Sequence, residues 1–255
     1  MERGFIPRMP WDFWAIFIVL GVVLPWRGRA RLQKLLALPQ MSSADRLSLY
    51  ASTILFQWFI VAVAAWRAWA RGLRLPEMGL VHQGRLNVLI LAIVGGATLG
   101  GLQWLNLRRM ARSHVKTRSL MRQLAERILP QSRKELALYL FLAVTAGLCE
   151  EFLYRGFAMA AFSRTGMPTW AVVLLSSVLF GLAHLYQGRS GFVSTLVIGT
   201  VFGTARIAYD ALVPVMTWHM AFDAVAGLAG PKYLLGLPQP ITPAEEEIQS
   251  AAAVE

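Results

Sequence analysis

The chain has 255 residues, of which 56% are hydrophobic and 15% are charged, with a mean hydropathy of +0.50 and a formal net charge of +11. Soluble domains are typically about 45–50% apolar and about 25% charged, so this composition excludes an ordinary soluble domain and indicates a polytopic membrane protein. The positive charge does not indicate a nucleic-acid partner, because the basic residues flank hydrophobic stretches: five Lys or Arg lie in residues 27–46 and nine in residues 108–134. We therefore expect the lipid bilayer as a partner and no nucleic acid.

Apolar stretches recur along the whole chain and predict an all-α transmembrane bundle of about seven spans. Each stretch is long enough to cross, or nearly cross, a hydrocarbon core of about 30 Å at about 1.5 Å per residue. The first and last are short. The predicted spans are residues 11–26, 48–70, 86–107, 136–162, 168–187, 191–209 and 213–230.

The same pattern divides the chain into four parts. Residues 1–110 hold about three N-terminal spans, and residues 136–230 hold the last four spans, which we expect to form the core of the bundle. Residues 111–135 are basic and predict an amphipathic helix on the membrane surface, with its apolar residues near one face: Leu120, Met121, Leu124 and Ile128. Residues 231–255 form a C-terminal tail that we expect to be disordered.

The distribution of Lys and Arg predicts the orientation. The two most basic loops follow the first and third spans, so both are expected in the cytoplasm. The N-terminus then lies outside and the C-terminus inside. We expect an integral, multi-pass protein of the cell (inner) membrane.

Strongly polar residues are few within the spans and concentrate in three of the last four. Intramembrane ionisable groups face a bundle interior or a wet cavity and by default indicate a functional site. Glu151 and Arg155 are four residues apart, so they share a helix face and are expected to form a clamping ion pair. Glu150 points about 100° away from Glu151 and is available to another helix. Ala146, Gly147 and Gly156 are small and should permit close helix packing.

Two later spans repeat the four-residue spacing. Phe180 and His184 share a face of one span, and His219 and Asp223 share a face of the last. Convergence of Glu150 with both histidines would supply the ligands of a hydrolytic zinc site, or a water activated directly by Glu and His. Spacing alone does not separate these two arrangements.

These motifs resemble a known family. Glu150-Glu151-x-x-x-Arg155, Phe180-x-x-x-His184 and His219-x-x-x-Asp223 resemble the motifs of the CPBP family, which includes the type II CAAX prenyl endopeptidases and the bacterial Abi and bacteriocin-processing relatives. The resemblance covers roughly residues 136–230.

The resemblance implies an intramembrane endopeptidase that hydrolyses a membrane-associated protein or peptide. It implies that Glu150 and His184 activate the attacking water, and that His219 and Asp223 support the oxyanion or bind a metal; Glu151, Arg155 and Phe180 would support them. The ligands of a divalent metal would be Glu150, His184, His219 and Asp223, and Zn²⁺ is the metal that suits them best. The family pattern allows Asn or Asp at the last position, and an ionised Asp223 cannot donate a hydrogen bond as Asn would. Orienting His219 or binding metal suits this carboxylate better.

Three other interpretations compete with this one. The chain can be a non-proteolytic scaffold or bacteriocin-immunity protein with the same fold, or a proton-coupled transporter, although no inverted repeat is visible. Cys149 beside Glu150 suggests a cysteine protease, but apolar surroundings disfavour its thiolate.

The distances between Glu150, His184 and His219 test whether these residues form one site. We expect side-chain atoms of Glu150, His184 and His219 within about 5 Å of one another, as ligands of one ion or water require. The predicted spans, however, place His184 near the end of its helix and Glu150 deeper. Tilt, a helix break or a misjudged end must then make up about 15 Å.

Overall fold

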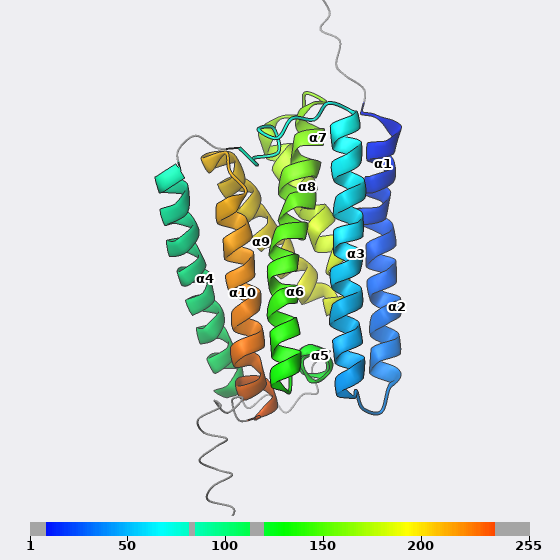
Figure 1. Cartoon of the computed structure of the whole chain (residues 1–255), viewed down its shortest axis with the longest axis vertical. Helices are drawn as coiled ribbons and strands as arrows, with labels where there is room; N and C mark the ends of the chain where they lie inside the picture. The colour runs from blue at the N-terminus through cyan, green and yellow to red at the C-terminus, as the bar shows by residue number, and fades with distance from the viewer. Residues whose placement is uncertain (1–8, 82–84, 113–119, 238–255) are drawn as a thin grey trace, which may run out of the picture.

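The computed structural model describes residues 9–81, 85–112 and 120–237, and within these ranges the chain is all-α with no strand. The helical elements follow one another in eight continuous segments (Figure 1). They are α1 (Trp11–Ile18) with η1 (Val19–Val23) and α2 (Leu24–Ala37); α3 (Ser43–Ala70); α4 (Arg85–Arg112); α5 (Leu120–Ile128); α6 (Arg133–Glu151) with η2 (Phe152–Ala158) and α7 (Met159–Ser163); α8 (Thr169–Ala183); η3 (Leu185–Gln187) with α9 (Gly188–Tyr209); and α10 (Val213–Gly230) with η4 (Pro231–Leu235).

Five of these segments are long and apolar enough to cross a membrane, so the chain is a multi-pass membrane protein. They are Trp11–Ala37, Ser43–Ala70, Leu86–Arg112, Arg133–Ser163 and Leu185–Tyr209. Two of the seven predicted spans are not among these five. The stretch 168–187 contains a helix of only 15 residues, Thr169–Ala183, and α10 is the other.

The ends of two elements also differ from the expected ones. The first span is not short, since its helix passes through a π-helical turn at η1 and continues beyond residue 26 to Ala37. The last helix continues through η4 to Leu235, five residues into the part predicted as tail. Residues 238–255 of that tail lie outside the described residues.

The described parts of the two basic segments lie at the same end of the bundle, as the predicted alternation requires. In Figure 1 the connection between α2 and α3 is at the lower end, together with α5 and the start of α6, and η4 also ends there. Leu124 of α5 is buried and Ile128 half-buried, which agrees with the predicted apolar face. The side chains of Leu120 and Met121 are outside the described residues.

The turn between α8 and α9 lies inside the bundle, and it accounts for the position of His184. A helix of 15 residues is about 22 Å long, shorter than a hydrocarbon core of about 30 Å. Figure 1 shows the α8–α9 turn well above the lower ends of the neighbouring helices. Gly188 permits this reversal with φ of 84°, a value that favours glycine. The sequence placed His184 about 15 Å from Glu150 along the bundle. The structure removes this separation because α8 ends early, at Ala183, so that His184 lies at the depth of Glu150.

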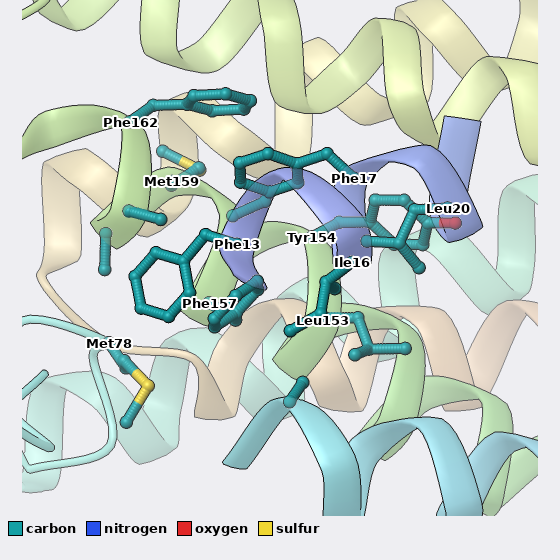
Figure 2. Close-up of a cluster of buried hydrophobic side chains, with 14 of the residues drawn as sticks. Phe13, Ile16, Phe17, Leu20, Met78, Leu153, Tyr154, Phe157, Met159 and Phe162 are labelled. Atoms are coloured by element: carbon teal, nitrogen blue, oxygen red, sulfur yellow. The ribbon is translucent and has the colours of Figure 1, made fainter. Parts of the chain in front are cut away.

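The helix that leads away from Glu151 is the centre of the bundle. Nearly every side chain from Glu151 to Phe162 is buried, as expected of a helix surrounded on all sides. Figure 2 shows Phe13 and Phe17 of the first helix packed on this segment. The Phe13 and Phe157 rings lie 4.9 Å apart edge to face, and those of Phe17 and Phe162 stack at 4.5 Å, distances typical of favourable aromatic pairs.

Glycine permits the close helix approach that was predicted near Glu150. A side chain at Gly147 would lie 2.5 Å from Cγ of Met220 and 2.9 Å from the carbonyl oxygen of Met216. Helix α6 therefore contacts the backbone of α10, which brings the helix of Glu150 against the helix of His219.

Ion pairs fasten both ends of the first helices. Asp12 at the start of α1 accepts hydrogen bonds from Arg67 and Arg71 at the end of α3. At the opposite end, buried Arg46 of α3 pairs with buried Glu135 of α6, at 2.6 Å and 3.2 Å. The Arg46–Glu135 pair uses both carboxylate oxygens, which is the stronger geometry for a guanidinium and a carboxylate, whereas the bonds to Asp12 all go to its Oδ2.

A third ion pair fixes the loop between α3 and α4 and makes the fold sensitive to acid. Arg164 donates to both carboxylate oxygens of Glu77, at 2.9 Å and 2.7 Å, and this lowers the pKa of Glu77 from 4.5 to about 2. Because the folded pKa is depressed, the stabilisation is complete above about pH 4.5 and is lost as the pH falls towards 2.

We expect Glu77→Gln to lower the melting temperature of the purified protein at pH 7 by a few degrees, equivalent to about 1–2 kcal/mol for a partly exposed bidentate pair. The melting temperature of the variant should also fall less than that of the wild type between pH 4.5 and pH 2. The measurement is a set of thermal melts across pH, with the exposed Glu126→Gln as control. Equal acid sensitivity in both proteins would contradict this assignment.

Candidate active site

Glu150 is held from outside its own helix. Its Oε1 accepts a hydrogen bond of 2.9 Å from Nε2 of Gln57 on α3. Its Oε2 is buried without a hydrogen-bond partner among the described residues. This second oxygen lies 3.9 Å from Nε2 of His184. The carboxylate therefore has one fixed oxygen and one that faces the imidazole.

The orientation of His184 defines its tautomer. Its Nδ1 lies 2.8 Å from the carbonyl oxygen of Phe180. A carbonyl only accepts, so Nδ1 must carry the hydrogen, and in the neutral ring Nε2 then has a free lone pair. Two acceptors, Nε2 of His184 and Oε2 of Glu150, thus face each other across 3.9 Å. One water that donates a hydrogen to each would satisfy both.

A second group of charges surrounds His219. Its Nδ1 lies 2.8 Å from Oε1 of Glu151, and the same oxygen accepts a bond of 3.0 Å from Nη1 of Arg155. Glu151 and Arg155 are fully buried and form the ion pair that their spacing predicts. On its other side, Nε2 of His219 is 3.6 Å from Oδ2 of Asp223. His219 therefore lies between two carboxylates, one of which the sequence spacing did not connect to it.

The ring of Phe180 packs against both histidines. Its ring centroid is 4.6 Å from that of His184 and 6.1 Å from that of His219. The guanidinium of Arg155 lies 4.3 Å from the same ring, on which it makes a cation–π contact. The predicted site residues are thus gathered in one region, as two pairs whose imidazoles both contact one aromatic ring.

This arrangement differs from a single four-ligand metal site. In the described part of the chain, no three His, Cys, Asp or Glu side chains are grouped so that they could hold one ion. Glu150 approaches His184, whereas Asp223 approaches His219. In this geometry the donor set does not fit a bound zinc. The zinc site therefore stays a prediction, and no step below depends on a metal.

A cavity of about 290 Å³ reaches the Glu150–His184 pair. Its walls come from α2, α3, α5, α6, η2 and the turn after α8. Most of its lining side chains are aliphatic or aromatic, and Glu150 and His184 are among the polar groups on its wall, an arrangement common in ligand and active sites. The side chain of Cys149 is buried, with 1% of the residue exposed, and does not line this cavity.

Gln57 is the residue of this site that sequence reasoning missed. It lies in α3, far from the three motifs, and interrupts the apolar run "TILFQWFIVAVA". An uncharged polar side chain in such a run was the available signal, but amides in transmembrane helices often serve only helix packing.

The match to known families falls on the region just described. The model of the Rce1-like type II CAAX prenyl endopeptidases matches residues 132–225. Residues 132–225 are a domain of this family. The match includes every predicted site residue from Glu150 to Asp223, and leaves α1 to α5, with Gln57, outside it. Comparison with curated proteins and with solved structures gave no match.

We expect Gln57→Leu to slow the proteolysis implied by this domain about tenfold or more, because a hydrogen bond to a charged group contributes about 1.5–3 kcal/mol. The loss should be in kcat and not in KM, since Gln57 acts through Glu150. The measurement is peptide cleavage by the purified variant. Gln103→Leu, a buried glutamine on α4, is the matched control, and equal losses in both variants would show a general packing effect.

Proposed function

We propose that this protein is an intramembrane endopeptidase that hydrolyses a peptide bond of a membrane-associated protein or peptide, of the CAAX-processing type or a bacterial analogue. The observation that carries the proposal is the pair of unsatisfied acceptors, Oε2 of Glu150 and Nε2 of His184, 3.9 Å apart on a cavity wall. The family domain over residues 132–225 supports a protease. The catalytic core is then formed by the last four predicted spans.

Glu150 is the general base in this proposal. Water donates one hydrogen to Oε2 of Glu150 and the other to Nε2 of His184, which turns an oxygen lone pair towards the scissile carbonyl carbon. Glu150 takes the first proton as the carbon–oxygen bond forms, and later passes it to the leaving nitrogen as the carbon–nitrogen bond breaks. Gln57 holds Oε1 throughout, so the proton is taken on Oε2.

His219 and Asp223 are proposed to support the oxyanion. A carboxylate only accepts, so Nδ1 of His219 donates to Glu151. If the ring carries both protons, Nε2–H is directed towards Asp223, where a developing oxyanion would compete for it. Glu151 and Arg155 act as positioning residues, since both are fully buried and neither lines the cavity.

The alternative function is a non-proteolytic scaffold or bacteriocin-immunity protein. The buried pairs Glu151–Arg155 and Arg46–Glu135 would serve such a protein equally well. An unsatisfied carboxylate oxygen on a cavity wall does not help packing, because a buried polar group without a partner costs stability. This favours the enzyme.

Glu150→Gln and His184→Ala should each reduce cleavage at least a hundredfold, as loss of a general base typically does, with little change in melting temperature. The measurement is cleavage of a membrane-associated peptide by purified protein in liposomes, with Glu126→Gln as the surface control. Wild-type activity in both variants would show that Glu150 and His184 do not activate the water, and a wild-type protein without cleavage activity would leave the scaffold function in place of the enzyme.

The same assay tests the metal. Full activity of metal-free protein in the presence of a chelator is expected if Glu150 and His184 activate water alone. Activity that is lost with the chelator and restored by zinc would instead support a metal held by Glu150, His184, His219 and Asp223.

Asp223→Asn separates the two roles of the last motif. If His219 and Asp223 support the oxyanion, the amide of the Asp223→Asn variant can donate a hydrogen bond to it, which an ionised carboxylate cannot. We then expect cleavage to be retained or increased up to about tenfold. A loss of a hundredfold or more would show that the negative charge of Asp223 is required, as a metal ligand or as a partner of His219. The measurement is kcat for Asp223→Asn and Asp223→Ala side by side.

We also propose that the basic end of the bundle faces the cytoplasm of the cell membrane, with the N-terminus outside and the C-terminus inside. The support is the clustering of the described basic segments at one end. In a Cys149→Ala background, a cysteine at exposed position 126 of α5 should be labelled by an impermeant reagent only after the membrane is opened. Labelling of intact cells would reverse the orientation.

A further inference from the structure

Two arginines of α2 face the cavity without a counter-ion. Arg27 and Arg31 both line it, and neither makes an ion pair with any described carboxylate. Arg31 donates to neutral acceptors only: Oγ of Ser52 at 2.7 Å, and Oγ1 of Thr53 and the carbonyl oxygen of Leu49, both at 3.4 Å. Arg27 lies over the Phe56 ring at 4.6 Å.

The two guanidinium groups are close enough to repel each other electrostatically. The other charged group on the cavity wall is Glu150, whose oxygens are directed to Gln57 and His184. Two arginines and one glutamate leave one net positive charge on this wall. Arg27 is exposed and Arg31 is half-buried, on the helix that leads to the basic end of the bundle, and an anion bound between the two arginines would balance their charge and relieve their repulsion.

The rest of the wall indicates what the anion is attached to. Most lining side chains are aliphatic or aromatic, and several of the neutral polar ones already use hydrogen-bonding protons within the protein. Tyr50 donates to the carbonyl oxygen of Ile128, Thr53 to that of Leu49, and Gln57 to Glu150. The peptide bond to be hydrolysed needs only the Glu150–His184 pair, but a peptide that ran on along the rest of this wall would bring two backbone polar groups per residue that the wall leaves largely unpaired, at a cost for each. An alkyl chain requires no such partners.

The volume restricts the ligand further. About 290 Å³ is at the lower end of small-ligand sites, which span about 300–1,000 Å³, so it suits one chain and not the two of a phospholipid. Most of this wall, including both arginines, comes from helices outside the family match to residues 132–225. We propose that the cavity binds a single-chain anionic amphiphile, with its carboxylate or phosphate head between Arg27 and Arg31 and its chain along the apolar wall.

The test measures binding without cleavage, so its result does not depend on whether the protein is a protease. The full-length protein in phosphatidylcholine nanodiscs is photolabelled with a diazirine derivative of palmitate, and labelled residues are mapped by mass spectrometry. We expect labels on the cavity-facing residues of α2 and α3. Laurate and dodecyl phosphate should suppress them at concentrations at least tenfold lower than dodecanol, and their relative potency distinguishes a carboxylate head from a phosphate head.

Charge variants connect the binding to the two arginines. The double variant Arg27→Gln, Arg31→Gln should lose at least five-sixths of the cavity labelling. Arg29→Gln, an exposed arginine of the same helix outside the cavity, should label as the wild type does. Because Arg31 also bonds to α3, the double Arg27→Lys, Arg31→Lys variant is included: it keeps both charges and should keep the labelling.

Three results would overturn the proposal. The first is equal labelling of the double glutamine variant and the wild type, and the second is equal competition by dodecanol and laurate. The third is suppression by an apolar peptide with a free carboxyl end at lower concentration than laurate, with no suppression by its amide, which would assign the arginines to a peptide ligand.

Discussion

The buried pair of Glu151 and Arg155 is the interaction on which the rest of this structure depends. Both side chains are completely buried, and bringing two charges out of water costs several kcal/mol each unless their mutual geometry compensates. The compensation comes from several helices at once: His219 of α10 bonds to Glu151, and the rings of Phe180 and Phe202 pack against the guanidinium. If one of these helices shifted, the pair would lose a compensating contact and its desolvation would destabilise the fold.

That constraint also explains the arrangement of the two histidines. His219 is fixed by its bond to Glu151, and Phe180 is fixed by its contact with Arg155. Since Nδ1 of His184 bonds to the carbonyl oxygen of Phe180, the second imidazole is also fixed relative to the ion pair. The charged centre therefore positions both histidines, although only one touches it. Gln57 adds the remaining contact from α3, on the opposite side of Glu150.

The sequence predicted the features that depend on local spacing. Residues four apart on one helix were expected to pair, and Glu151 with Arg155 and His219 with Asp223 lie within ion-pair distance. The small residue Gly147 was expected at a close helix contact and is at one. The identification of the family from the three motifs is confirmed by the match over residues 132–225.

Features that depend on contacts between distant residues were not predictable in the same way. Gln57 and Glu150 are 93 residues apart, and no periodicity connects them. The early end of α8 was hidden because Leu185 and Tyr186 follow His184, so the predicted span ran on to residue 187. Glu151 was expected to satisfy only Arg155, since the bond to His219 requires the packing of α6 against α10. The roles of these side chains in catalysis, and a metal at the site, stay predictions.

The short α8 has a consequence for how the protein is made. Helices α8 and α9 enter and leave the bundle at the same end, and their connecting turn lies within it (Figure 1). The polar residues of that turn, His184 and Gln187, would be poorly solvated in lipid alone. The hairpin therefore has no stable place in the bilayer until η1, α2 and η2 pack against it. Its insertion must follow the assembly of these earlier helices, so the Glu150–His184 pair is completed only late in biogenesis.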